Sequence, residues 1–357
     1  MHNQFLLAAL DQAWLGRGIC APNPAVGAVA VQNGSIIAQA SHRGCGTPHA
    51  EQLLLAQLPS NMLGITVYVS LEPCNHWGKT PPCVDAIIQY GVAQVVYAYR
   101  DPNPVVQAND TSALLRQHGI DVLYMPLPEV DRFYESYRHW TLTHKPWVTA
   151  KIAQTFDGKI AGALGARTSL SNELCHHFTH TQRQHTDIIL TTARTIATDD
   201  PQLNVRLSQE VKAKPVAILD RTLSLDAQAT VLSTAARCHI YHDAQYPVRR
   251  AHPRCSYHAI PTHLSELDLN AILHHLGSLG YHDVWVEAGG RLFGALHQAK
   301  LVNRTHVYLV PLMLGEKGVP VCQQAGIFNQ ANTLSWLPMG NNMIASLDWE
   351  EDVCLQV

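Results

Sequence analysis

Pro48-His49-Ala50-Glu51, followed by Pro73-Cys74 and Pro82-Cys83, is the most informative part of this chain, because it supplies three zinc ligands and a proton carrier. One neutral imidazole and two thiolates can occupy three corners of a zinc tetrahedron, and the fourth corner then stays open for water. Zinc held in this way activates the water near neutral pH. Glu51 lies close enough to carry a proton without ligating the metal. The pattern indicates hydrolytic deamination.

The proline-rich segment between the two cysteines is followed by a helix-like run, Val84 to Tyr90, and preceded by a strand-like run, Ile65 to Ser70. Proline fixes φ and lacks an amide hydrogen, so Pro82 suits a helix start and places Cys83 in the first turn. The partial positive charge of a helix N-terminus favours a thiolate there. Because His49 also precedes a helix-like run, we expect two helix N-termini to hold the metal.

Two other interpretations of these residues stay open. A structural zinc site would need a fourth protein ligand, and His42, Cys45 and His76 are available. Alternatively, the cysteines are buried free thiols. The number of residues between the two cysteines also differs from the zinc deaminase signature. That signature has two (Cys-x-x-Cys), whereas this chain has eight between Cys74 and Cys83.

The chain resembles the family of bifunctional riboflavin biosynthesis proteins, which join a pyrimidine deaminase to a pyrimidine reductase. In that family, a long loop between the two cysteines is usual. The resemblance extends to the C-terminus and rests on Ala21-Pro22-Asn23-Pro24-Ala25-Val26-Gly27, Gly46-Thr47-Pro48-His49-Ala50-Glu51, Leu71 to Cys83 and Asp101-Pro102-Asn103-Pro104.

The resemblance implies an α/β protein with two domains. Residues 1–144 would form a cytidine-deaminase-like layered domain, and residues 145–357 a dihydrofolate-reductase-like domain. The first would bind Zn²⁺ through His49, Cys74 and Cys83, with Glu51 as the proton donor. Its substrate pocket would contain Asn23, His76, Lys79, Asp101 and Asn103. Lys79 could offer a cation to a ribose phosphate, although a solvated loop lysine is the alternative.

The second domain would bind NADPH under the same resemblance. After Val284 to Glu287, two glycines lead from a strand into a helix, where backbone amides can approach a phosphate. Without the family, this segment reads as a tight turn, because it lacks Gly-x-Gly-x-x-Gly. The implied cofactor residues are Ala153, Ser169, Thr195, Asp199, Arg221, Gly289, Gly290, Arg291, Leu292, Phe293, Gly294 and Ala295. The implied reductase-substrate residues are Lys151, Arg167, Arg183, Leu203, Arg206 and Glu287.

The implied activity has two steps. The amino group at position 2 of 2,5-diamino-6-(5-phosphoribosylamino)pyrimidin-4-one would be hydrolysed, and NADPH would then reduce the ribosyl side chain to ribityl. Arg183 and Arg206 could pair with the substrate phosphate, because a guanidinium donates two parallel hydrogen bonds. Surface salt bridges are the alternative for both.

Three positions depart from the family pattern. Ser169 replaces a tryptophan, Arg167 replaces a small polar residue, and Arg221 stands where serine is frequent. One hypothesis is that Arg221 makes a charge contact with the 2′-phosphate of NADPH. The alternative is an active deaminase with a catalytically silent reductase-like binding or dimerisation domain.

Composition agrees with a two-domain enzyme. At 357 residues, the chain exceeds what one core usually serves. A net charge of −3 and 7% aromatic residues argue against nucleic acid as a partner, and hence against an RNA deaminase. A deaminase of free nucleosides would not need the second half. Nine cysteines without a secretory signal favour a reducing, cytoplasmic compartment, and no apolar run approaches a membrane span. The family also implies a homo-oligomer.

Alternating strand-like and helix-like runs predict an α/β layer structure in both halves. The pattern breaks near residues 140–146. In the first half we expect strands at residues 25–31, 65–70 and 94–98, with helices at 50–58, 84–90 and 111–118, after an N-terminal helix that reaches Trp14. In the second half we expect strands at residues 147–153, 187–191, 215–220, 283–287 and 306–310.

Overall fold

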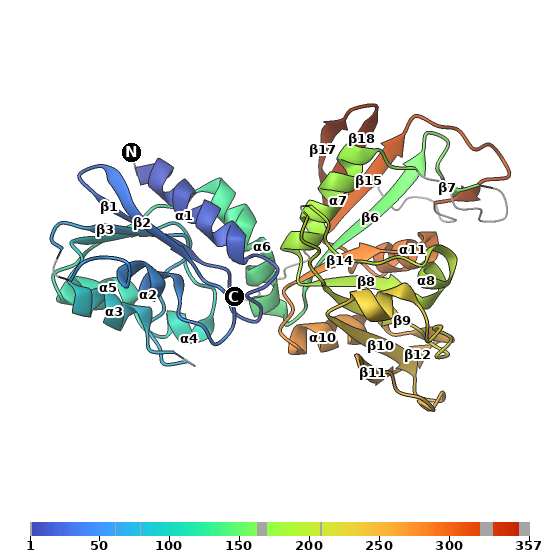
Figure 1. The fold of residues 1–357 in the computed structure, drawn as a ribbon, viewed down its shortest axis with the longest axis horizontal. Coiled ribbons are helices and arrows are strands. Elements are labelled where there is room, and N and C mark those ends of the chain that lie inside the picture. The colour runs from blue at the N-terminus through green and yellow to red at the C-terminus, as the bar shows by residue number, and fades with distance from the viewer. Residues whose placement is uncertain are drawn as a thin grey trace. The chain divides into compact units, whose positions relative to one another are not determined.

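The computed structural model describes residues 2–60, 62–78, 80–162, 170–207, 209–321 and 331–349. The predicted site residues Lys79, Arg167 and Ser169 lie outside these ranges. The chain forms two compact units, Met1–Lys145 and Pro146–Val357, each built of helices and a sheet (Figure 1).

The first unit contains a five-stranded sheet in the order β2-β1-β3-β4-β5. Strand β1 is antiparallel to β2 and β3, whereas β3, β4 and β5 run parallel. The strands are β1 (Gly27–Gln32), β2 (Ser35–Ser41), β3 (Thr66–Val69), β4 (Gln94–Tyr97) and β5 (Asp121–Tyr124). The helices are α1 (His2–Gly16), α2 (Ala50–Leu55), α3 (Cys83–Tyr90), α4 (Pro104–Gln107), α5 (Thr111–Gln117) and α6 (Pro128–Thr143).

Both faces of this sheet are apolar, which explains why the first unit has three layers. On one face, Val29 packs with Leu6 of α1 and Phe133 of α6. On the other, Ala28 packs with Leu54 of α2 and with α3 and α5. Because successive strand residues point to opposite faces, β1 contributes to both cores. Figure 1 shows α1 and α6 on one side of the sheet and α2, α3 and α5 on the other.

The second unit contains a nine-stranded sheet in the order β11-β10-β9-β8-β14-β6-β15-β18-β17. Its strands are parallel from β11 to β15, and β18 and β17 continue it antiparallel. The strands are β6 (Trp147–Thr155), β8 (Ile188–Thr192), β9 (Pro215–Leu219), β10 (Arg237–Asp243), β11 (Cys255–Ile260), β14 (Asp283–Glu287), β15 (Arg304–Val310), β17 (Ala331–Met339) and β18 (Asn342–Trp349).

Five helices of the described residues complete this unit: α7 (Glu173–His185), α8 (Ala193–Asp199), α9 (Thr230–Thr234), α10 (Leu269–Ser278) and α11 (Gly290–Gln298). Two short ribbons pair β7 (Lys159–Ala161) with β16 (Val319–Pro320), and β12 (Thr262–His263) with β13 (Glu266–Leu267).

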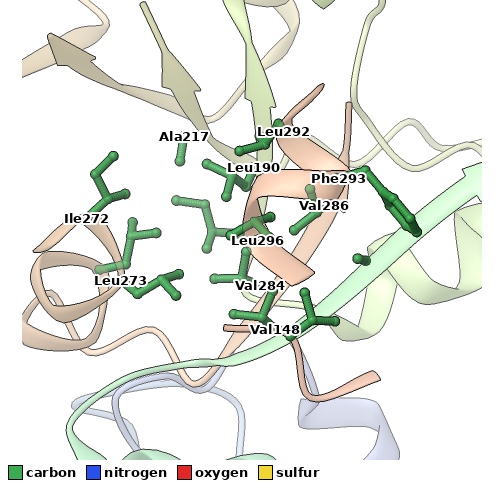
Figure 2. Packing of buried hydrophobic residues seen from close by; sticks show 14 of the residues in the cluster. Val148, Leu190, Ala217, Ile272, Leu273, Val284, Val286, Leu292, Phe293 and Leu296 are labelled. Carbon is green, nitrogen blue, oxygen red and sulfur yellow. The ribbon is translucent and has the colours of Figure 1, made fainter. Parts of the chain in front are cut away.

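The central strand β14 shows how the second core is built. Val284 and Val286 lie on one face, where α10 and α11 pack on the sheet. Figure 2 shows Phe293 and Leu296 among the buried side chains of this cluster. Trp285 lies on the opposite face, in a separate cluster. The alternation also leaves Glu287 at the end of β14 on the same face as Trp285.

The predicted α/β class is confirmed, and the expected strands and helices are present with ends that differ by a few residues. The predictions missed several strands, among them β10, β11, β17 and β18. None of the helices in the described part of the chain combines the length and hydropathy that a membrane crossing needs.

Helix α1 approaches β1 so closely that Gly27 has no room for a side chain. A Cβ there would lie 2.0 Å from Ala9 O and 2.4 Å from Ala13 N, which are backbone atoms of α1. We expect Gly27→Ala to lower the free energy of unfolding by about 1–3 kcal/mol, because helix and strand must separate. Urea unfolding measures this change.

Gly78→Ala is the matched control, because a Cβ at Gly78 meets no atom within 4 Å. Its unfolding midpoint should stay that of the unchanged protein. An equal midpoint for Gly27→Ala would contradict the close approach of α1 to β1.

Candidate functional site

Two helix N-termini bring the predicted zinc ligands together. His49 is the N-cap of α2, with extended backbone (φ −71°, ψ 164°), and Pro82 is the N-cap of α3. Cys83 is therefore the first residue of α3, as expected from Pro82. Its backbone N donates a hydrogen bond to Cys74 Sγ at 3.3 Å. This amide orients the sulphur of the loop cysteine toward the other two donors.

The three donor atoms form a compact group. His49 Nδ1 lies 3.5 Å from Cys74 Sγ and 3.3 Å from Cys83 Sγ, and all three donors lie within 4.8 Å of one another. Two thiolates and one imidazole are a donor set typical of zinc. Within the described ranges, neither His42, Cys45 nor His76 belongs to this group. No fourth His, Cys, Asp or Glu of the described residues joins the three donors, so a closed structural zinc site is not favoured.

Glu51 lies in the first turn of α2 and is only 3% exposed. Burial raises the pKa of Glu51 to about 7, and the neighbouring Cys74 thiolate acts in the same direction, whereas His49 opposes it. A carboxyl group with a pKa near the working pH can both take up and release a proton. This environment suits the predicted proton carrier.

The predicted pocket residues Asp101 and Asn103 belong to one ordered loop. Asp101 Oδ1 accepts hydrogen bonds from Asn103 N at 2.9 Å and from Tyr137 Oη at 3.1 Å. Burial raises the pKa of Asp101 to about 6. Asn103 caps α4 by accepting from Val105 N. Tyr137 could not be predicted as a partner of Asp101, because it is 36 residues away in the chain and has no local signature.

Asn23 and His42 form a second polar pair in this unit. Asn23 Nδ2 lies 3.3 Å from His42 Nε2, and the buried His42 ring packs edge-on against the His49 ring, with centroids 5.2 Å apart. The sequence pattern indicates His42 only as a possible metal ligand. Its contacts indicate that it positions both Asn23 and the ring of His49.

In the loop between the two cysteines, two buried polar atoms have no hydrogen-bond partner among the residues that the structure describes. They are His76 Nδ1 and Asn75 Oδ1. The other end of the Asn75 amide is satisfied, because Nδ2 donates to Val106 O, Asn109 O and Thr111 Oγ1. Buried polar atoms are rarely left without a hydrogen bond unless a ligand or water uses them. His76 is thus well placed to contact a polar substrate.

In the second unit, Arg183 and Glu287 form a buried ion pair. Arg183 Nε donates to Oε1 at 2.6 Å and Nη2 donates to Oε2 at 2.9 Å, while Nη1 donates to Asn204 O at 2.9 Å. Burial alone would raise the pKa of Glu287, but the charge and hydrogen bonds of Arg183 outweigh it and lower the pKa to about 2. Nε, Nη1 and Nη2 of Arg183 thus all donate to oxygens of the protein. The expected contact of Arg183 with a phosphate therefore stays a prediction.

Lys151 is the residue of β6 that pairs with Glu287 in the sheet register. Its Nζ lies 4.9 Å from the centre of the Tyr308 ring. Burial lowers the pKa of Lys151, and the Glu287 carboxylate opposes this. Register pairing therefore places a cation and a carboxylate side by side at one end of the central strands.

The remaining substrate candidates lie in one segment. Arg206 Nη1 donates to Gln202 Oε1 at 3.2 Å and also contacts the Asn204 side chain. Leu203 is 2% exposed as a whole residue and belongs to an apolar cluster, so its expected contact with a substrate stays a prediction. Sequence reasoning missed Asn204, which links Arg183 to Arg206.

The two glycines at the start of α11, the N-cap Gly289 and the first helical residue Gly290, differ in their surroundings. A Cβ at Gly290 would lie 2.2 Å from Val321 O, whereas a Cβ at Gly289 meets no atom within 4 Å. Leu292 and Phe293 are buried in the core and Gly294 is buried as well (Figure 2). Of this segment, Gly289 is open, and the first N–H groups of α11 have no partner within the helix.

The other cofactor candidates are spread over several elements. Thr195 Oγ1 lies 2.9 Å from Thr192 Oγ1 at the start of α8, which ends at Asp199. Arg221 follows β9, and its carbonyl accepts from Asp243 N. Ala153 packs against a small cluster with Tyr308 and Cys175, Arg291 forms an exposed ion pair with Glu266, and Ala295 is half-buried.

Two family models match the chain. The model described as the cytidine and deoxycytidylate deaminase zinc-binding region matches residues 1–99. The RibD C-terminal domain matches residues 146–345. The zinc donors lie inside the first match, and the segment from Lys151 to Ala295 lies inside the second.

Relatives match over nearly the whole chain. Riboflavin biosynthesis protein RibD of Escherichia coli is 32% identical over 340 residues, which cover 92% of each chain. The protein of the same name from Aquifex aeolicus is 33% identical over 319 residues, 88% of each.

Solved structures agree in fold. Acinetobacter baumannii RibD (form 1) has a TM-score of 0.86 at 27% identity and covers 98% of this chain and 99% of its own. A diaminohydroxyphosphoribosylaminopyrimidine deaminase/5-amino-6-(5-phosphoribosylamino)uracil reductase from Thermotoga maritima has a TM-score of 0.84 at 29% identity, with the same coverage. The chain therefore belongs to the family of bifunctional riboflavin biosynthesis proteins, enzymes that join a zinc-binding deaminase to an NADPH-dependent reductase.

Proposed function

We propose that residues 1–144 deaminate 2,5-diamino-6-(5-phosphoribosylamino)pyrimidin-4-one and that residues 145–357 reduce the ribosyl side chain of the deaminated product to ribityl. The observation that carries the proposal is the group of His49, Cys74 and Cys83, with buried Glu51 beside it. The open Gly289 before α11 supports the reductase half.

The donor set fits zinc, because two sulphurs and one imidazole nitrogen already converge. When bound, zinc would supply an activated water as the nucleophile. Glu51 takes a proton from water and passes it to the departing amine. The ring carbon thereby loses its amino group as ammonia and gains an oxygen. His76, Asn23 and Asn103 would bind the polar edges of the ring and its ribose phosphate.

The residues of the second unit fit NADPH and a phosphorylated substrate. Gly289 leaves space for a pyrophosphate to approach the N-terminus of α11, where the helix dipole favours an anion. When bound, NADPH would supply the hydride for C1 of the opened ribose. Lys151 and Arg206 offer cations to the substrate, and Glu287, held ionised by Arg183, lies opposite Lys151 in the sheet register and favours its charged form.

The silent-domain alternative is not favoured, because the second unit matches the RibD C-terminal domain over residues 146–345. A homo-oligomer is a further part of the proposal, and light scattering on the purified chain measures it. We also propose a cytoplasmic location. The chain has nine cysteines, an odd number without an evident pairing pattern, which favours a reducing compartment.

A coupled assay with Glu51→Gln tests the deaminase half. The unchanged, zinc-loaded protein should release ammonia and then consume NADPH from the diaminopyrimidine ribotide. Glu51→Gln should keep its zinc but lose ammonia release by roughly 10²–10⁴-fold, because only the proton carrier is removed. NADPH consumption should return when the deaminated ribotide is supplied directly.

Glu129→Gln is the control, since Glu129 is exposed on α6. Zinc loss in Glu51→Gln would contradict the proton role. Ammonia release without NADPH consumption in the unchanged protein would restore the silent-domain alternative.

Alanine substitutions of the adjacent residues Gly289 and Gly290 distinguish an effect on cofactor binding from an effect on folding in the reductase half. We expect Gly289→Ala to keep its thermal midpoint but to bind NADPH about tenfold more weakly, because a methyl group would enter the space left for the pyrophosphate. Gly290→Ala should instead unfold more easily, because its Cβ meets Val321 O at 2.2 Å. Calorimetric titration with NADPH and thermal unfolding measure the two effects. Unchanged NADPH affinity in Gly289→Ala would remove this glycine from the cofactor site.

Arg221→Ala tests the proposed 2′-phosphate contact. Loss of a charge-assisted hydrogen bond should weaken NADPH by about 1.5–3 kcal/mol while leaving NADH binding unchanged. Titrations with both cofactors measure the preference. The contact does not exist if the NADPH/NADH affinity ratio stays the same.

A further inference from the structure

Cys238 and Cys255 are directly paired residues of two neighbouring parallel strands, β10 and β11. Both side chains belong to the same apolar cluster on one face of the sheet. Neighbouring strands lie about 4.8 Å apart, which is inside the Cα separation of about 4.4–6.8 Å that a disulfide can bridge. The fold therefore holds two free thiols at bonding range, far in sequence from the zinc ligands.

The two thiols differ in their access to solvent. Cys238 is completely buried, whereas Cys255 is partly exposed. Cys255 also lines a cavity of about 440 Å³, together with His252, Tyr257 and Arg250. A small oxidant can reach Cys255 through this cavity, while Cys238 lies behind it.

The surroundings of Cys255 favour its thiolate. Its Sγ lies 3.7 Å from His252 Nδ1. A hydrogen bond from the Cys238 thiol lowers the pKa of Cys255 to about 7, and His252 acts in the same direction against the effect of burial. The pKa of Cys238 is raised by the same hydrogen bond and by burial. The accessible sulphur is thus also the more nucleophilic one near neutral pH.

The strand that carries Cys255 has freedom to adjust. β11 is the edge of the nine-stranded sheet, so it has a neighbour on one side only. The spacing of neighbouring strands, about 4.8 Å, is slightly wider than the Cβ separation of about 3.8 Å in a relaxed disulfide. A small movement of an edge strand can close this difference without disturbing the central strands.

We propose that Cys255 and Cys238 form a peroxide-sensitive thiol pair, in which Cys255 attacks the oxidant and Cys238 resolves the product. The Cys255 thiolate attacks one oxygen of a hydroperoxide, the O–O bond breaks, and the sulphur becomes a sulfenic acid as hydroxide or alkoxide leaves. Cys238 sulphur then attacks Cys255 sulphur, the S–O bond breaks, and water leaves with the thiol proton. Two electrons pass from the thiols to the peroxide, and a dithiol reverses the reaction.

Peptide mapping of the zinc-loaded full chain after treatment with hydrogen peroxide tests the pair. With thiols blocked and no reductant added, a peptide linked through Cys238 and Cys255 should be found, and dithiothreitol should remove it. Cys45 is the internal control, because it is exposed. The proposal is overturned if Cys45 is oxidised while Cys238 and Cys255 both remain thiols.

Variants test the order of the two steps. In Cys238→Ala, dimedone should label Cys255, because the sulfenic acid has no resolving partner. In Cys255→Ala, Cys238 should stay a thiol; labelling of Cys238 instead would refute the assigned order. His252→Asn should slow oxidation of Cys255 by roughly threefold through a smaller thiolate fraction, whereas His263→Asn, at an exposed position, should not. Equal rates in the two histidine variants would refute activation by His252.

Discussion

The convergence of two helix N-termini on His49, Cys74 and Cys83 is the constraint on which the first unit depends. α2 and α3 begin at these donors and pack on the same face of the sheet, so their starting points set where both helices lie. Glu51 is buried beside the donors because it occupies the first turn of α2. One local geometry thus determines ligand position, proton carrier and helix packing together.

The zinc donors could be predicted from the sequence because their signals are local. Proline at position 82 favours a helix start through its own fixed φ, and the spacing of His49 and Glu51 places both at one helix end. The Arg183–Glu287 pair could not be found in this way, because 104 residues separate the partners. Only the family resemblance pointed to both, and it did not reveal that they contact each other.

The missed strand β10 shows why the sequence pattern alone was insufficient. β10 carries His239, Tyr241 and His242, polar residues that break an apolar pattern, yet all three are buried. His239 lies 3.1 Å from both His258 Nε2 and Tyr281 Oη, and Tyr241 Oη lies 2.9 Å from His275 Nδ1. Their hydrogen bonds come from other elements, so hydrophobic periodicity alone could not recognise the strand.

The contrast between Gly289 and Gly290 also bears on how such chains diverge. Backbone contact with Val321 constrains Gly290 in any sequence that keeps this fold, whether or not it binds a nucleotide. A Cβ at Gly289 meets no atom within 4 Å, so under the proposed function it is the bound cofactor that constrains this residue. A related protein that has lost reductase activity would keep Gly290 but could carry another residue at position 289. The residue at position 289 therefore indicates whether a protein of this architecture has a working cofactor site.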